Sequence, residues 1–116
     1  MIKIKRVYAG WEAADGYRVL VDRIWPRGMT KEAARCDEWL REIAPSNELR
    51  KWYDHQPERW VEFVRRFRKE LAAPEGAAHL KRLRSLGRKG TVTLVFSSRE
   101  EKLNNAIALK QIIADP

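Results

Sequence analysis

The chain has only one cysteine, Cys36, and two histidines among its 116 residues. One thiol cannot form an intramolecular disulfide or build a cysteine-based zinc site. The histidines, His55 and His79, are far apart in the chain and lack the close spacing of a metal-binding pair. We therefore expect no metal and no cofactor, and a reducing, cytoplasmic environment.

Long apolar runs are also missing. No stretch approaches the roughly 20 apolar residues that cross a bilayer, and the N-terminus MIKIKRVY lacks the apolar core of a secretory signal. The glycine patterns of nucleotide-binding loops, G-x-x-x-x-G-K-[ST] and G-x-G-x-x-G, do not occur. These absences argue against a membrane partner and against a standard nucleotide-triphosphate loop.

What the chain does contain is enough apolar material for one core and an excess of positive charge. Hydrophobic residues make up 44% of the sequence, and the connections are short, so residues 1–116 are expected to form a single α/β domain. Lysine and arginine number 24 against 16 acidic residues, a net charge of +8. A positive field favours small anionic ligands or nucleic acid as partners. The oligomeric state stays open.

Three segments have the character of strands. Residues 2–8 alternate apolar and charged side chains, as an edge strand does, and Tyr17–Ile24 forms a second strand. Residues 91–96, TVTLVF, are β-branched and apolar and predict a central strand. The short loop before Tyr17 favours a hairpin or another adjacent arrangement of the first two strands.

The remaining segments predict helices. Thr30 can cap a helix over residues 31–43, in which four apolar side chains share one face: Cys36, Trp39, Leu40 and Ile43. Further helical pieces follow up to residue 86, and a last helix is expected from about Arg99 to Ala114. The predicted fold is a small, mostly parallel three-stranded sheet with helices packed around it and a helical insert between the second and third strands.

The stretch VLVDRIWPRG, residues 19–28, combines a strand end with unusual chemistry. Arg23 and Arg27 each offer a guanidinium fork to phosphate or carboxylate, and Trp25 can form an apolar wall. Asp22 is a candidate to orient the arginines or to act as a base. The alternative is purely structural: Asp22 pairs with an arginine, and Trp25 packs in the core.

A second polar cluster follows the predicted third strand. Ser97 and Ser98 lead into the last helix, and Asn104 and Asn105 follow within it. Ligands of open α/β sheets bind at the carboxyl ends of the strands, and a helix start can hold an anion. Ser98 with Glu101 also fits a capping box, which needs no ligand.

Several segments together resemble the YeaO-like family: GYRVLVDRIWPRG, DEWLREIAPSNELRKWY, HQPERWVEFVRRFRKEL and GTVTLVFSSREEKLNNAIALK. This is a bacterial domain-of-unknown-function family of small single-domain proteins. The resemblance implies an α/β fold and a set of motif residues rather than a reaction. Those residues are Asp22, Arg23, Trp25, Pro26, Arg27, Gly28, Asp37, Trp39, Pro45, Ser46, Leu49, Arg50, Trp52, His55, Trp60, Asn104, Asn105 and Ala106.

One position departs from the family pattern. Relatives commonly have a histidine before the asparagine pair, whereas this chain has Leu103. A catalytic role that needs that imidazole is therefore weakened, while a binding role is not. His55 is the remaining candidate imidazole, and an exposed loop histidine is its structural alternative.

The sequence supports one preferred function and two alternatives. The preferred function is binding, or acting on, a phosphorylated or carboxylated metabolite in a cleft between the DRIWPRG loop and the SSREE helix start. Its candidate ligand-binding residues are Arg23, Trp25, Arg27, Ser97, Ser98, Asn104 and Asn105, with Asp22 and His55 as catalytic candidates. The first alternative is a nucleic-acid-binding module that uses the basic residues 65–69. The second is an interaction subunit with exposed tryptophans.

Overall fold

The computed structural model describes residues 1–115. Within this range the chain forms a four-stranded, fully parallel sheet in the order β1-β4-β2-β3. The strands are β1 (Ile2–Arg6), β2 (Tyr17–Leu20), β3 (Glu38–Trp39) and β4 (Val92–Phe96). The predicted α/β character and parallel sheet are confirmed, whereas the predicted number of three strands is wrong.

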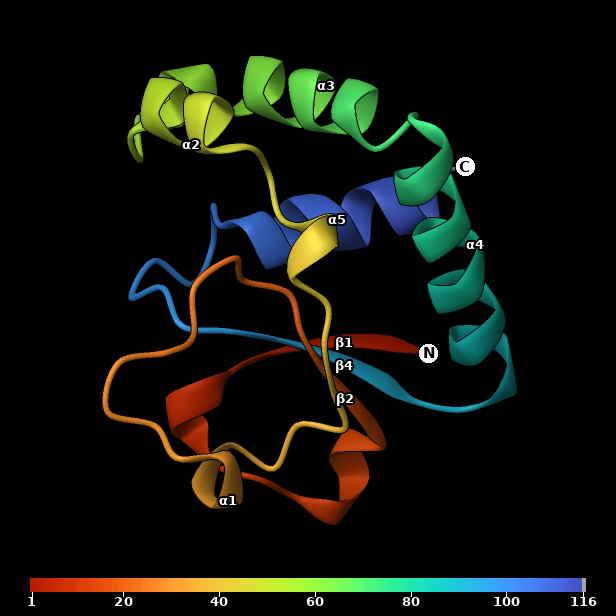
Figure 1. The fold of residues 1–116 in the computed structure, drawn as a ribbon. Coiled ribbons are helices and arrows are strands. Elements are labelled where there is room, and N and C mark those ends of the chain that lie inside the picture. Colours follow the sequence, from red (N-terminus) through yellow and green to blue (C-terminus); the bar gives the residue numbers. More distant parts are fainter. Residues whose placement is uncertain (116) are drawn as a thin grey trace.

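The helices lie on both sides of this sheet (Figure 1). α5 and α4 cover one face, α2 and α3 lie beyond α5, and α1 lies on the opposite side. The α-helices are α1 (Lys31–Ala34), α2 (Asn47–Tyr53), α3 (Trp60–Glu70), α4 (Pro74–Lys89) and α5 (Asn105–Ala114), and short 3-10 turns are η1 (Val7–Ala9), η2 (Ala13–Asp15), η3 (Arg41–Ile43) and η4 (Pro57–Arg59). Each helix within residues 1–115 is too short or too polar to cross a membrane.

β4 is the central strand and β1 an edge strand, as predicted. All five residues of β4 are buried, because β1 and β2 flank the strand and helices or loops cover both of its faces. The expected hairpin between β1 and β2 is wrong, since β4 lies between them. The turns η1 and η2 return the chain to the other end of the sheet, where Tyr17 N–H donates to the carbonyl of Thr91. β2 therefore runs parallel to β1 and to β4.

The fourth strand replaces the end of a predicted helix. Thr30 caps α1 as expected, but α1 ends at Ala34, because Arg35 adopts the left-handed conformation with φ +47°. Glu38 and Trp39 then pair with β2. Trp39 packs with the apolar side chains on one face of the sheet, and Leu40 joins the core on the other. Side chains that alternate between the two faces are typical of a strand. The same residues also have the spacing of an apolar helix face, which is why the sequence predicted a helix here.

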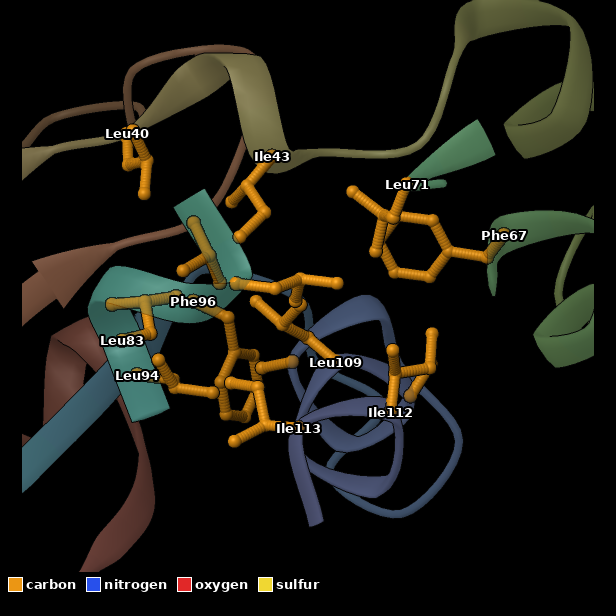
Figure 2. Close-up of a cluster of buried hydrophobic side chains, with 14 of the residues drawn as sticks. Leu40, Ile43, Phe67, Leu71, Leu83, Leu94, Phe96, Leu109, Ile112 and Ile113 are labelled. Atoms are coloured by element: carbon orange, nitrogen blue, oxygen red, sulfur yellow. The ribbon is translucent and has the colours of Figure 1, made fainter. Parts of the chain in front are cut away.

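The main core lies between the sheet, α3, α4 and α5. Figure 2 shows side chains of these elements pointing toward one another, including Phe67, Leu83, Leu94 and Leu109. Each of these four side chains is at most 2% exposed. The core holds α5 against β4, so it fixes the segment that joins them.

The opposite face of the sheet contains a buried ion pair. Arg18 is completely buried, and its guanidinium donates to Asp15 at 2.6 Å and to the carbonyls of Ala34 and Arg35. Lys5 also contacts the Asp15 carboxylate at 3.2 Å. Burial raises the pKa of Asp15, but bonds from the Glu12 N–H, Arg18 and Lys5 outweigh it and leave that pKa below its ordinary value.

Replacing Arg18 with Met is expected to lower the free energy of unfolding by about 3–5 kcal/mol, because it leaves the buried Asp15 carboxylate without its closest partner. Urea denaturation measures this difference. Arg66→Met is the control: Arg66 pairs with Glu62 on the surface and is expected to matter little. Equal stability of the two variants would contradict a stabilising role for the buried pair.

The lowered pKa of Asp15 also predicts how stability depends on pH. The unfolded chain, with an Asp15 pKa near 3.8, takes up a proton at higher pH than the folded chain does. This contribution to stability is therefore complete above about pH 5 and declines as pH falls through the folded pKa. In denaturation curves recorded from pH 6 to pH 2, Asp15→Asn should show a shallower decline than the unchanged protein. An unchanged slope would contradict the assignment.

Candidate functional site

A cavity of about 550 Å³ opens at the carboxyl ends of β2 and β4. Residues 22–24, which follow β2, form one wall, and residues 97–105, between β4 and α5, form another. Residues 44–55, which include α2, close a third side. Figure 1 shows the corresponding orange and blue loops near one another, below α2. In parallel sheets, ligands bind at this end of the strands.

Asp22 connects two of these walls. Its Oδ2 accepts hydrogen bonds from the backbone N–H of Ser97 at 2.8 Å and from the Ser97 hydroxyl at 2.7 Å. The side-chain amide of Asn105 donates to Asp22 Oδ1 and to the carbonyl of Val21, both at 3.1 Å. The Asp22 backbone carbonyl accepts from Trp39 Nε1 at 2.7 Å. The carboxylate therefore holds loops together, and its bonds go to Ser97 and Asn105 rather than to the arginines.

The segment after Ser97 is not a helix start. α5 begins at Asn105, where the Asn104 side chain accepts a hydrogen bond from the N–H of Ile107 at 2.9 Å. The predicted start near Arg99 and the capping box of Ser98 with Glu101 are wrong. Residues 97–104 instead form a loop, because the side-chain amide of Asn104 donates to the carbonyl of Glu100 and folds the chain back on itself.

The Glu100 side chain accepts hydrogen bonds from two backbone N–H groups of this loop. Its carboxylate accepts from the N–H groups of Lys102 at 2.8 Å and Leu103 at 3.0 Å. These bonds, together with the nearby charges of His55 and Lys102, hold the pKa of Glu100 below its ordinary value. An external anion therefore has no free N–H group at these two positions, and side chains must provide its donors.

Arginine side chains supply positive charge around the cavity. The Arg23 guanidinium donates to the carbonyls of Ala44 at 3.1 Å and Pro45 at 3.2 Å through Nη2. Its position is thus fixed while its charge stays unpaired, since no carboxylate of residues 1–115 lies in ion-pair contact with it. Arg50, on α2, and Arg99 also line the cavity, and both are exposed.

An apolar wall lies among these charges. The Tyr53 and Phe63 rings are stacked, with centroids 4.4 Å apart, and both line the cavity. Tyr53 donates its hydroxyl to the carbonyl of Leu103 at 3.1 Å, and burial raises the pKa of that hydroxyl above its ordinary value. Leu103 and Ile24 add aliphatic surface. The hydroxyl of Tyr53 is therefore neutral and already bonded.

His55 lies in the lining, just after α2. Asp54 and His55 have φ of +46° and +52°, the left-handed conformation that is unfavourable for residues with a Cβ. The imidazole is exposed, and its ring centroid is 6.2 Å from that of Tyr53. The fold thus places the sequence-predicted imidazole beside the aromatic wall.

The cavity brings together most of the residues that the sequence singled out. Its lining includes Asp22, Arg23, His55, Ser97, Ser98, Asn104 and Asn105. Trp25 and Arg27 are not in this lining. Trp25 packs against Trp39 with ring centroids 5.3 Å apart, which agrees with its structural alternative, and Arg27 is exposed. Ser97, Asn104 and Asn105 use their side-chain N–H or O–H donors within the protein.

Nine residues of the lining were not among the site residues predicted from the sequence: Ile24, Ala44, Pro45, Arg50, Tyr53, Phe63, Arg99, Glu100 and Leu103. Arg50 was among the motif residues of the family resemblance, and the helical insert that contains Arg50 and His55 was expected to be able to fold over the strand ends. Among residues 1–115, no three histidine, cysteine or carboxylate side chains are grouped so that they could hold a metal. The lining itself combines three arginines with an apolar wall.

The chain belongs to the DUF488-N3i family, whose model matches residues 1–116 and is described as the inactive DUF488-N3 subclade. The expected relationship to YeaO-like proteins is also confirmed. The uncharacterized protein YeaO of Escherichia coli (strain K12) is 42% identical over 108 residues, which cover 93% of this chain and 92% of YeaO.

A second relative has similar coverage. The uncharacterized protein Rv3073c of Mycobacterium tuberculosis (strain H37Rv) is 43% identical over 112 residues, 97% of this chain and 92% of the relative. No solved structure matches the chain.

Replacing Asp22 with Ala is expected to lower the free energy of unfolding by about 2–4 kcal/mol, because the donors of Ser97 and Asn105 lose their acceptor. Urea denaturation measures the loss, and hydrogen exchange should show faster exchange of the Ser97 amide. Glu101→Ala, which removes an exposed carboxylate from the same loop, is the control. Unchanged protection of the Ser97 amide in Asp22→Ala would contradict the proposed link between the two loops.

Proposed function

We propose that this protein binds a small phosphorylated or carboxylated ligand in the cavity between the DRIWPRG loop and residues 97–105. The observation that carries the proposal is that Arg23, Arg50 and Arg99 line one cavity at the carboxyl ends of β2 and β4. Both carboxylates of the lining, Asp22 and Glu100, already accept hydrogen bonds from the chain. The arginines are thus the groups best suited to an anion.

Binding without turnover is the form of this function that we favour. The family to which the chain belongs is described as an inactive subclade. Leu103 lies in the cavity lining at the position where the family resemblance implies a histidine. An aliphatic side chain cannot transfer protons, so any role of that histidine as an acid or base is lost here.

The alternative functions have less support. Arg65 and Arg66 on α3 share Glu62, and Arg68 pairs with Asp115, so two carboxylates offset half of the four positive charges of residues 65–69 that were expected to bind nucleic acid. An exposed tryptophan patch is also disfavoured, because Trp39, Trp52 and Trp60 are half-buried. The net charge of +8 is as compatible with a small anion as with nucleic acid.

The proposal is tested by titrating the protein with inorganic phosphate and with sulfate in a calorimeter, at constant ionic strength. We expect binding in the millimolar range, reduced about tenfold or more in the double variant Arg50→Gln/Arg99→Gln, because two charged donors are lost. These two side chains are exposed, so their replacement should leave the fold intact. Arg23→Lys tests the third arginine, since lysine keeps the charge but not the planar donor fork.

Arg27→Gln is the matched control. Arg27 belongs to the same loop as Arg23 and is exposed, but it does not line the cavity. Its replacement removes one positive charge from this end of the molecule and should leave phosphate binding unchanged within about twofold. The single variant Arg99→Gln, which removes the same charge from the lining, is measured beside it. Equal losses in the two single variants would mean that binding responds to total charge, which contradicts a site at the cavity. The proposal fails if neither anion binds or if the double variant binds both as well as the unchanged protein.

A further inference from the structure

We infer that the ligand of this cavity is an organic anion whose charged group is carried on an apolar body with few hydroxyl groups. The inference rests on the function proposed above and adds the chemistry of the uncharged part of the ligand. The cavity, at about 550 Å³, is far larger than a bare phosphate ion needs, since a water molecule occupies only about 30 Å³ of liquid. It falls within the usual range for organic ligands.

The apolar body is indicated first by the aromatic wall. Tyr53 and Phe63 are stacked and only 5% and 2% exposed, so the core holds both rings in place. The Tyr53 hydroxyl is bonded to the carbonyl of Leu103, so this wall offers the cavity carbon surface rather than a free hydroxyl. A rigid apolar wall favours an aromatic or aliphatic group, because contact with it removes apolar surface of the ligand from water, while the already buried rings provide close van der Waals contact.

Ile24 extends this surface toward solvent. It lines the cavity beside Arg23, yet its side chain is 62% exposed. Leu103 and Pro45 contribute further apolar atoms to the lining. An apolar ligand that contacts Ile24 would cover some of this surface, whereas a bare inorganic anion would leave it in water. The lining therefore suits a ligand that has both an anionic end and an apolar end.

A hydroxyl-rich body is disfavoured by the hydrogen bonds already present. Ser97 donates to Asp22, and the amides of Asn104 and Asn105 donate to Glu100 and Asp22. To donate to a sugar hydroxyl, Ser97 and Asn105 would have to break bonds within the protein, which costs more than the new bond returns. Within residues 1–115, the Ser98 hydroxyl and one N–H of the Asn104 amide donate no bond, so they suit a small polar group, and the arginines suit the anionic group.

Calorimetry with five probes tests the inference: inorganic phosphate, phenyl phosphate, glucose 6-phosphate, benzoate and acetate. We expect phenyl phosphate to bind about tenfold or more tightly than inorganic phosphate, because the ring removes apolar surface from water. Glucose 6-phosphate should bind no more tightly than inorganic phosphate. The benzoate and acetate pair repeats the comparison with a carboxylate as the anionic group.

The variant Ile24→Ser links the effect to this cavity. It should weaken phenyl phosphate about threefold or more and leave inorganic phosphate unchanged, because only the ring contacts the replaced side chain. Val61→Ser is the matched control: Val61 is another branched aliphatic residue, 82% exposed, and it lies outside the lining. That control should not change either affinity.

The outcomes separate the inference from the function on which it rests. Inorganic phosphate could bind, with weaker binding in the arginine variants, while phenyl phosphate binds no more tightly than inorganic phosphate. In that case the inference of an apolar ligand body is wrong, and the proposed anion site is supported. Tighter binding of glucose 6-phosphate than of phenyl phosphate would also overturn the inference. If no probe binds, the anion site itself fails.

Discussion

The carboxylate of Asp22 holds together segments that are far apart in the chain. It accepts hydrogen bonds from Ser97, after β4, and from Asn105, at the start of α5, while its backbone carbonyl accepts from Trp39. Because β2 and β4 are parallel neighbours, their carboxyl ends diverge into separate loops at one edge of the sheet. The Asp22 bonds keep these loops adjacent, and the walls of the cavity depend on that adjacency.

The hydrogen bonds to Asp22 also determine which charges at the site are paired. A carboxylate that accepts from Ser97 and Asn105 is occupied by neutral donors, so it does not pair with Arg23. Glu100 is likewise occupied by backbone N–H groups. Positive charge at the cavity is thus left without a direct ionic partner among residues 1–115, even though acidic residues lie close by in sequence. Composition alone could not have predicted this distribution.

The sequence predicted the parts of the fold that are set by local pattern. Residues 91–96 are β-branched and largely apolar, and Val92–Phe96 form the buried inner strand β4. The polar residues after it meet those after β2, as parallel strands require. That the helical insert with Arg50 and His55 covers the strand ends was a hypothesis from the sequence. The packing that brings Tyr53 and Phe63 to the same place could not be predicted, because it is not visible in the spacing of any one segment.

The wrong secondary-structure predictions have a common physical origin. A short sequence pattern is compatible with more than one local structure, and contacts with distant parts of the chain determine which of them forms. Trp39 and Leu40 suit a helix by spacing, but pairing with β2 sends them to opposite faces of the sheet. Ser98 and Asn104 are both good helix caps. Asn104 caps α5 because its side-chain oxygen meets the N–H of Ile107, and its amide turns the preceding loop back through Glu100.

Leu103 connects the two proposals about the site. Its backbone carbonyl accepts a hydrogen bond from the hydroxyl of Tyr53, and both residues line the cavity. A histidine here, as the resemblance implies for relatives, would place a polar and titratable group against the aromatic wall. Leucine instead extends the wall as carbon surface. Relative to the histidine that the resemblance implies, leucine offers no group for proton transfer and a more apolar surface, which is the combination expected of the proposed site, one that holds an organic anion without transforming it.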